Sequence, residues 1–342
     1  LWYLERLHLG KHRIDESKSL ISISFMEVKE IQNREILQAY MKYELGITGQ
    51  AVSTIVRRFV CIRNFIELLE QEKILAIHAT VAEVKKYADG LRERGIQAKG
   101  FNERIFGIGH FYKFMEVKQY ITRMPFRIEY FQQKEVVLHH DRSVEETVYM
   151  EILKKLYLFP ERLRCMFLHL WCLGLRASEV CTLKGNAYYQ QGEDYWIQVY
   201  QVKMKNYKKI PIPQALYQIM KIYLKKYEIQ PEEFIFKNSR GGACLYGTFR
   251  TQMIEACREN KIANGEYLFK SHDYRHTVAT MFYDSHVSLQ SIRDYLGHTY
   301  EEMTRQYVDY MPQRIAQAND KFFDQQESSL VSWLRKEEQD AK

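Results

Sequence analysis

Apolar residues in the first third of the chain recur at helical spacing. The clearest stripe covers about five helical turns and consists of Val52, Ile55, Val56, Phe59, Ile62, Phe65, Ile66 and Leu69. Such a stripe is typical of a helix that buries one face. Thr80 and Glu83 form a capping-box pattern that opens a further helix, which Gly90 and Gly95 close. Residues 29–125 therefore predict a bundle of about four helices.

Proline and polar residues mark the end of this bundle. No proline precedes Pro125, and residues 126–143 are polar and show no sustained period, so we interpret them as a linker. Residues 1–28 contain a strand-like stretch and are a candidate remnant of an arm-binding region. The pattern alone does not assign them.

The second half of the chain mixes helical and strand patterns. Ser143 and Glu146 suggest another capping box, and the apolar run from Cys165 to Leu175 predicts a buried helix. Two short strands, 195–202 and 209–212, flank a lysine-rich turn at 203–208. A short edge strand is expected at 234–236, and mostly helix from about 248 to 311. The fold predicted is mostly α with a small β-sheet.

Composition excludes several classes of protein. Hydrophobic residues make up 46% and charged residues 27% of the 342 residues, which is the balance of a soluble globular protein. The longest nearly unbroken apolar run has eleven residues, well short of the roughly 20 that a membrane-spanning helix needs. The six cysteines form no C-x-x-C pair, which favours reduced thiols over disulfides.

The charge is moderately positive. The net charge of +7 suits nucleic acid but also many enzymes with neutral substrates. Between Lys29 and Arg123, 16 lysine and arginine residues face 11 acidic ones. This bundle is either an ordinary solvated domain or a basic clamp that follows a phosphate backbone.

Two candidate phosphate-binding patterns lie in the second half. In LGLRASEV (residues 173–180), a helix ends at Gly174 and presents Arg176, with Glu179 three residues on. A guanidinium there can bind a phosphate through two parallel hydrogen bonds, with the glutamate holding it in place. The alternative is a helix-end arginine in a local ion pair. The turn KMKNYKK (residues 203–209) can place a lysine in a DNA groove, or it is simply a solvated basic turn.

A third pattern is HDYRHT (residues 272–277). His272 and Arg275 are three residues apart, so they share a helical face and can converge on one ligand. Metal binding by His272 and His276 is an alternative. The H-E-x-x-H arrangement is absent, however, and Arg275 would place a cation beside the metal.

The fourth pattern is LGH (residues 296–298), followed by Tyr307. Tyr310 is an alternative nucleophile nearby. The set that combines these patterns consists of Arg176, Lys203, His272, Arg275, His298 and Tyr307. It supplies what phosphodiester transfer through a protein nucleophile requires: cations for the phosphorane, a proton donor for the leaving alkoxide and a phenol that attacks.

At these residues the sequence resembles the tyrosine recombinases, the family of phage integrases and Xer-like site-specific recombinases. LRASE (175–179) resembles the first arginine box, HDYRHT the H-x-x-R box and LGH the next box. Tyr307 lies nine residues after His298, where the family places its nucleophile. Lys203 lies eight residues before Pro211, the spacing of the family's hairpin lysine, so we prefer it to Lys205. The motifs cover about residues 150–312, with a looser likeness over 29–125.

The resemblance implies a C-shaped clamp on duplex DNA. Its parts would be an all-helical core-binding domain (29–125), the linker (126–143), a mixed α/β catalytic domain (144–312) and a tail helix (313–342) for subunit contacts. It implies that Tyr307 forms a 3′-phosphotyrosine without metal, ATP or another cofactor. Lys203 is then the general acid and His272 assists proton transfer. Arg176, Arg275 and His298 contact the non-bridging oxygens, with Glu179 in support.

The resemblance also suggests partners. We expect double-stranded recombination sites, a monomer or dimer on one site, a tetramer in the synapse, and accessory DNA-bending proteins. Candidate DNA contacts are Arg57, Arg58, Lys205 and Lys208. A cytoplasmic, bacterial or phage-encoded protein of a mobile element is expected, with no membrane partner. The alternatives are a type IB topoisomerase, a hairpin telomere resolvase or a DNA-binding protein without activity.

Overall fold

The computed structural model describes residues 1–19, 22–135, 142–202, 204–297 and 304. Four residues discussed above, Lys203, His298, Tyr307 and Tyr310, lie outside the described residues, as does the predicted tail, 313–342. Their roles therefore stay predictions from the sequence.

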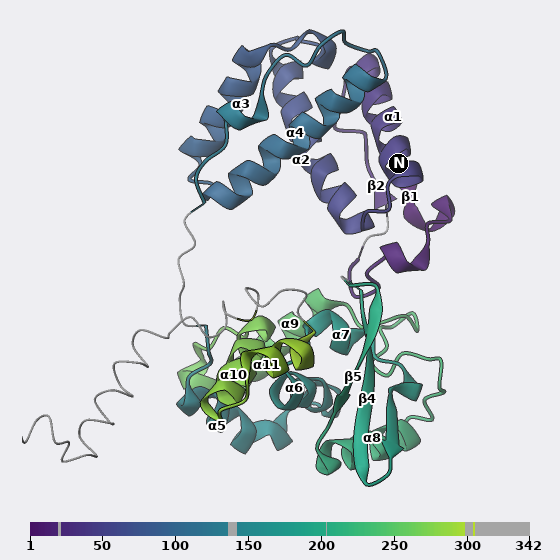
Figure 1. Ribbon diagram of the computed structural model, residues 1–342, viewed down its shortest axis with the longest axis vertical. Helices are drawn as coiled ribbons and strands as arrows, with labels where there is room; N and C mark the ends of the chain where they lie inside the picture. The colour runs from purple at the N-terminus through teal and green to yellow at the C-terminus, as the bar shows by residue number, and fades with distance from the viewer. Residues whose placement is uncertain (20–21, 136–141, 203, 298–303, 305–342) are drawn as a thin grey trace, which may run out of the picture.

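The first domain is a helical bundle with a short N-terminal extension (Figure 1). Its helices are α1 (Ile31–Ile47), α2 (Val52–Gln71), α3 (Val81–Glu93) and α4 (Ala98–Val117), which confirms the predicted helices. Thr80 and Glu83 form the predicted capping box. The helix passes through Gly90, however, and ends before Gly95, so Gly90 does not close it.

The described residues among 1–28 pack into the same core as the bundle. Strands β1 (Trp2–Tyr3) and β2 (Ser22–Ile23) pair antiparallel. Apolar side chains of this extension join the stripe of α2 in a single hydrophobic cluster: Leu4, Ile23, Phe25 and Val28. The extension thus covers one face of the bundle.

The second domain consists of helices around a small sheet. Its helices are α5 (Glu146–Lys155), α6 (Glu161–Leu173), α7 (Ala177–Cys181), α8 (Gln214–Lys226), α9 (Tyr246–Glu259), α10 (Ser271–Asp284) and α11 (Leu289–Leu296). Strands β3 (Tyr188–Gln191), β4 (Asp194–Gln201) and β5 (Asn206–Pro211) form an antiparallel sheet in that order. The predicted mostly α fold with a small β-sheet is confirmed.

Two further local predictions need correction, and one strand was missed. The sequence did not reveal β3. The predicted edge strand at 234–236 is only a bridge between Lys184 and Phe234. Ser143 does not cap α5: its hydroxyl bonds to Thr280 on α10, and Glu145 occupies the position before the helix without a side-chain cap.

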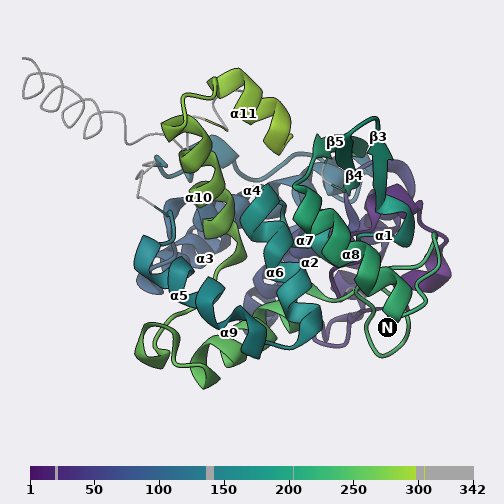
Figure 2. The same ribbon diagram turned by 90° about the horizontal axis from the view of Figure 1, so that it is seen from below.

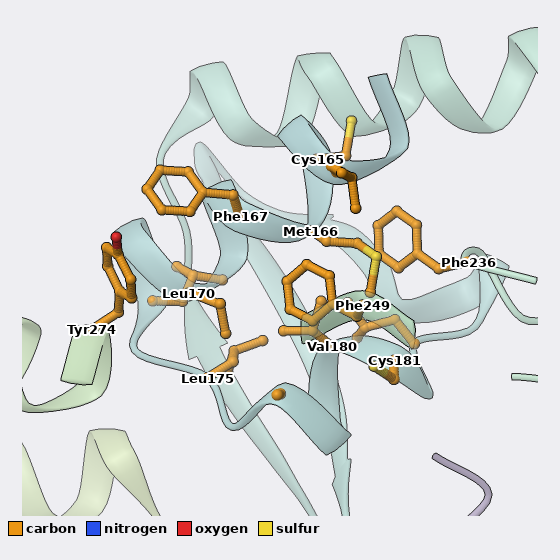
Figure 3. Close-up of a cluster of buried hydrophobic side chains, with 14 of the residues drawn as sticks. Cys165, Met166, Phe167, Leu170, Leu175, Val180, Cys181, Phe236, Phe249 and Tyr274 are labelled. Carbon is orange, nitrogen blue, oxygen red and sulfur yellow. The ribbon is translucent and has the colours of Figure 1, made fainter. Parts of the chain in front are cut away.

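The apolar run that was predicted to form a buried helix lies at the centre of the second domain. Met166, Phe167 and Leu170 of α6 are fully buried, and Phe167 meets Tyr274 of α10 edge to face (Figure 3). This core, from Val144 to Tyr274, is separate from that of the bundle. Each domain therefore has its own core, as independent folding units do.

The arrangement within the second domain leaves α6 and α7 in the middle. Seen from below, α10 and α11 lie on one side of them and the three-stranded sheet on the other (Figure 2). Side chains from both sides can therefore meet at the C-terminal end of α6. In the part of the chain that the structure describes, no helix is both long and apolar enough to cross a membrane.

Candidate active site

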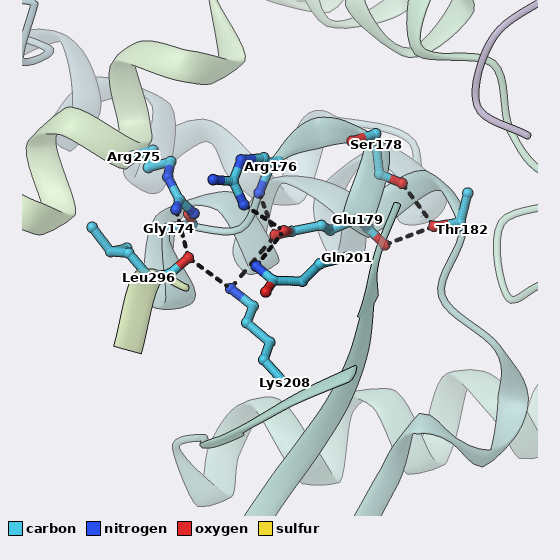
Figure 4. Close-up of polar contacts among 9 residues, drawn as sticks. All are labelled: Gly174, Arg176, Ser178, Glu179, Thr182, Gln201, Lys208, Arg275 and Leu296. Atoms are coloured by element: carbon cyan, nitrogen blue, oxygen red, sulfur yellow. Dashed lines mark hydrogen bonds and ion pairs between the residues drawn. The ribbon is translucent and has the colours of Figure 1, made fainter. Parts of the chain in front are cut away.

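A buried carboxylate, that of Glu179, organises the site. Helix α6 ends at Gly174 in the left-handed conformation (φ +58°), and α7 begins directly after Arg176. Glu179 is only 2% exposed. It accepts hydrogen bonds from the backbone N–H and the guanidinium of Arg176, at 2.8 and 2.9 Å (Figure 4). The predicted local ion pair therefore exists and orients Arg176.

The β4–β5 hairpin supplies two more partners of this carboxylate. Gln201, at the end of β4, donates from Nε2 to Glu179 Oε1 at 3.1 Å. Lys208, on β5, places Nζ 3.5 Å from Glu179 Oε2. Both side chains are buried, so the sheet is tied to α7 by polar contacts that solvent does not reach.

Helix α10 delivers Arg275 to the same place from the other side. Arg275 is fully buried and donates to the carbonyls of Gly174, at 2.8 Å, and Leu296, at 2.5 Å. Lys208 Nζ also approaches the Leu296 carbonyl, at 3.4 Å. One carbonyl at the end of α11 thus joins two cations that come from the sheet and from α10.

The turn after α11 fits tightly against this group. Gly297 adopts φ +68°, and a β-carbon there would lie 2.4 Å from Gln201 Nε2. Only glycine accommodates both the left-handed backbone and this close approach. The turn leads into His298, so the backbone that precedes that residue is fixed by Arg275, Lys208 and Gln201.

The electrostatics of the group are unusual for a buried carboxylate. Burial opposes ionisation, but the charges of Lys208, Arg275 and Arg176 and the hydrogen bond from the Arg176 backbone outweigh it and lower the pKa of Glu179 to about 2. Burial also lowers the pKa of Lys208, to about 8. The attraction of Glu179 opposes this shift, but repulsion from Arg275 and Arg176 cancels part of that attraction. Within these four residues, three cations therefore face one anion at pH 7.

His272 lies at the start of α10, where its side chain reaches solvent. Desolvation and the positive charges of Arg275, Arg176 and Arg142 lower its pKa to about 4. His276, one turn further, meets His272 edge to face, and its pKa is lowered to about 3, mainly by burial. His272 is therefore neutral at pH 7.

The structure thus brings together Arg176, Glu179 and Arg275, with His272 on the same helix as Arg275. It also adds Gln201 and Lys208. Sequence patterns missed Gln201, and they placed Lys208 in a solvated turn as a DNA contact. Lys208 is instead buried (9% exposed), with its ammonium against Glu179 and the Leu296 carbonyl. The burial of Lys208 had one signal in the sequence. Lys208 lies two residues before Ile210, and side chains two residues apart on a strand such as β5 point to the same face.

The remaining candidate DNA contacts lie elsewhere. Lys205 Nζ donates to the backbone carbonyl of Gly49 at 3.0 Å. Arg58 pairs with the buried Glu44, whereas Arg57 is exposed and pairs with Glu103. Over the described residues, no group of three or more His, Cys, Asp or Glu side chains could hold a metal ion.

A family model describes this part of the chain. Residues 142–314, half of the sequence, match the phage integrase family. The chain therefore belongs to this family, whose motifs were identified above around Arg176, Arg275 and Leu296.

Individual relatives are more distant. Transposase B from transposon Tn554 of Staphylococcus aureus is 24% identical over 332 residues, which cover 94% of this chain and 52% of that protein. The chain thus spans about half the length of this relative. Tyrosine recombinase XerC of Bacillus licheniformis is 23% identical over 295 residues, which cover 81% of this chain and 89% of that protein.

Solved structures share the fold. The XerH site-specific recombinase bound to palindromic difH substrate, a post-cleavage complex, has a TM-score of 0.60 with 14% identity, over 87% of this chain and 90% of that one. A lambda integrase dimer bound to a COC′ core site has a TM-score of 0.59 with 18% identity, over 80% and 94%. The likeness covers both domains.

Proposed function

We propose that this protein cuts and rejoins DNA at specific sites of a mobile element, through a covalent 3′-phosphotyrosine at Tyr307. Membership of the phage integrase family supports this reaction class, and the likeness to a transposase and to Xer recombinases supports the biological setting. The substrate, the assembly and the activity of the whole protein are parts of the proposal.

The observation that carries the proposal is the charge imbalance around Glu179. One carboxylate orients Arg176 and Lys208 and lies within the field of Arg275, so two positive charges are left over. Lys208 and Arg275 are buried, the Arg176 side chain is 19% exposed, and all three are held by fixed partners, so they need no reorganisation when an anion arrives. Such a preorganised group suits a phosphodiester and, more strongly, the doubly charged phosphorane that follows attack.

The reaction then divides among named residues. Tyr307 attacks the scissile phosphorus and passes its proton toward neutral His272. The bond from phosphorus to the 5′-oxygen breaks, and Lys203 protonates that oxygen. Arg176, Arg275 and His298 bind the non-bridging oxygens. Attack by the 5′-hydroxyl of a partner duplex reverses these steps, so the phosphotyrosine conserves the bond and no nucleotide cofactor is needed.

DNA binding would involve both domains. Duplex DNA lies between them in this proposal, with exposed Arg57 of α2 contacting the backbone from the bundle side. Two proteins that share the fold support DNA as the partner, since XerH was solved bound to its difH substrate and a lambda integrase dimer bound to a core site. A tetramer in the synapse, joined through residues 313–342, completes the assembly that we propose.

The test is a covalent adduct in the presence of EDTA. The protein is incubated with nicked duplexes cut from the ends of its own genetic element, and SDS-resistant adducts are measured. We expect an adduct with the wild type and with Tyr310→Phe, and none with Tyr307→Phe. Tight binding without any adduct in the wild type would favour a DNA-binding protein without activity.

A further inference from the structure

The two domains contact each other on the side away from their chain connection. The described parts of the chain on either side of residues 136–141 lie on the left in Figure 1. On the right, the N-terminal extension approaches the second domain, and the Tyr246 N–H donates to the Ser17 carbonyl at 2.8 Å. Lys205 donates to the Gly49 carbonyl on the same side, at 3.0 Å. The molecule is therefore joined at two opposite edges.

Residues 13–17, which we call the strap, are anchored at both ends. The buried guanidinium of Arg13 donates to the carbonyls of Leu45 and Gln50 at 2.6 and 2.9 Å, near the C-terminal end of α1. Ser17 is 1% exposed, and both its backbone N–H and its hydroxyl donate to Asp15. The strap is therefore fixed to the bundle and presents one carbonyl to α9.

This junction is hollow. A cavity of about 400 Å³ lies between the strap and the second domain, lined on the strap side by His12, Ile14 and Glu16 and on the other by residues that include Thr182 and Tyr207. Contacts through single hydrogen bonds around a cavity can separate without exposing a large apolar surface. The junction can therefore open and close while each domain stays folded.

Lys205 connects this junction to the active site in three steps. It sits in the β4–β5 turn with a left-handed backbone (φ +55°), and its own N–H donates to the Gln201 carbonyl at 2.8 Å. The Gln201 side chain donates to Glu179, as does Lys208 on the returning strand β5. The tip of this hairpin thus touches the bundle, while its base touches the carboxylate that orients Arg176.

We propose that Lys205 is a positioning residue for strand cleavage. Its bond to Gly49 lies where the strap joins the same two domains. This bond aligns the hairpin with the active site when the domains are closed. The inference rests on the proposed function, because the reaction it serves is cleavage. It also changes the expected role of Lys205 from a phosphate contact to a contact between domains.

The first test separates these two roles. Cleavage of a nicked duplex is measured in single turnover at saturating protein, and affinity is measured separately at several salt concentrations. We expect Lys205→Met to slow the saturated rate about three- to tenfold, as the loss of one solvent-exposed hydrogen bond implies, with affinity and salt slope unchanged. Lys205→Arg should restore the rate, because a guanidinium can still reach the carbonyl.

Lys209→Met is the matched control, since Lys209 is exposed on the same hairpin and its ammonium lies over the ring of Tyr189. It should leave the rate unchanged. A saturated rate of wild-type value in Lys205→Met would overturn the proposal. So would weaker binding with a smaller salt slope at an unchanged rate, because that result assigns Lys205 to phosphate.

The second test asks whether the strap and Lys205 act together. Tyr246 is the first residue of α9, a position that accepts proline, so Tyr246→Pro removes the N–H that bonds to Ser17 without breaking the helix. Tyr246→Ala removes the same ring but keeps the N–H. We expect only the proline variant to slow cleavage, and its effect to be non-additive with Lys205→Met.

Additive effects, or equal effects of the alanine and proline variants, would contradict the proposal that the strap and Lys205 act together. The failure of the proposed function looks different: the wild type itself would give no Tyr307-dependent adduct. A wild type that cleaves while Lys205→Met cleaves equally well refutes the positioning role alone.

Discussion

Among the residues that the structure describes, each domain buries one glutamate against arginine, and the pKa values of the two carboxylates shift in opposite directions. In the bundle, Glu44 pairs with Arg58 at 3.2 Å, and burial raises its pKa despite Arg58 and Arg13. In the second domain, burial is outweighed by Lys208, Arg275 and Arg176, and the pKa of Glu179 is lowered to about 2. Burial alone therefore does not determine the charge of the site; the number of cations does.

This difference separates a structural ion pair from a binding site. Arg58 balances Glu44, and Arg13 adds one further positive charge nearby, so the excess there is smaller than around Glu179. Glu179 fixes cations that outnumber it, and their excess charge is available to a phosphate. A buried ion pair by itself is weak support for stability or function, whereas an unbalanced buried cluster needs an anion to complete it.

The largest effect is expected on catalysis. Arg176→Ala should slow covalent adduct formation by 100-fold or more, which corresponds to about 3 kcal/mol for one stabilising donor. Arg275→Ala should do the same but should also destabilise the domain, because Arg275 holds the Gly174 and Leu296 carbonyls. Arg176→Ala is thus the cleaner variant. Rates come from single-turnover cleavage and folding from circular dichroism.

Arg240→Ala, in an exposed turn, is the control and should cleave normally. If the Arg176→Ala protein kept cleavage within tenfold of the wild type, Arg176 would not belong to the active site. The contrast between Arg176 and Arg58 would then fail as well.

The next effect is opposite pH dependence of stability. The folded pKa of Glu179 lies below its unfolded value of 4.5, so the unfolded chain binds the proton first as pH falls. Its contribution, on the order of 3 kcal/mol, is present above pH 4.5 and is lost toward pH 2. Glu44 has a raised pKa, so its folded form takes up the proton first and this group increasingly favours folding as pH falls toward 4.5.

The measurement is urea unfolding at a series of pH values for the wild type, Glu179→Gln and Glu44→Gln. The difference between the wild type and each variant should change with pH in opposite directions. Parallel curves would mean that the two carboxylates do not differ as described.

A moderate effect is expected at the turn before His298. Gly297→Ala combines a left-handed backbone with a β-carbon 2.4 Å from Gln201 Nε2, so it should cost about 2–4 kcal/mol. Gly192→Ala is matched in φ, at +62°, but has no atom within 4 Å of the added carbon, so about 1 kcal/mol is expected. Thermal melts compare them. Equal losses would show that crowding by Gln201 contributes nothing.

The smallest effect concerns the bundle surface. Arg57 is exposed and pairs with exposed Glu103, so Arg57→Met should change stability by less than about 1 kcal/mol. It should weaken DNA binding and reduce the salt slope by about one unit. Arg58→Met should instead destabilise the bundle, because it leaves Glu44 unpaired. Affinity titrations at several salt concentrations and thermal melts distinguish the two; a stability loss in Arg57→Met alone would reverse these assignments.

Local signals predicted the fold well where they act within one element. The stripe from Val52 to Leu69 and the Thr80–Glu83 capping box belong to such elements, and the β4–β5 hairpin follows from alternation and a polar turn. Polar β3 has no such pattern, and it is a strand because it pairs with β4. Ser143 failed as a cap because Thr280, distant in sequence, offers its hydroxyl a partner.

The site likewise contains residues that a local motif predicts and residues that only the packing of several elements brings in. Arg176, Glu179 and Arg275 stand in recognisable motifs, so the sequence could name them. Gln201 and Lys208 carry no motif, and their burial depends on how the sheet packs against α7 and α11. The Leu296 carbonyl, which receives two cations, is a backbone group that no side-chain pattern can reveal.

The most direct measurement is the identity of the residue that holds the DNA. Trypsin digestion of the SDS-resistant adduct leaves the nonapeptide QYVDYMPQR, residues 306–314, which contains both Tyr307 and Tyr310. Fragmentation of this peptide with its attached nucleotide should place the phosphate on Tyr307. A phosphate on Tyr310, or on a peptide from another part of the chain, would contradict the account.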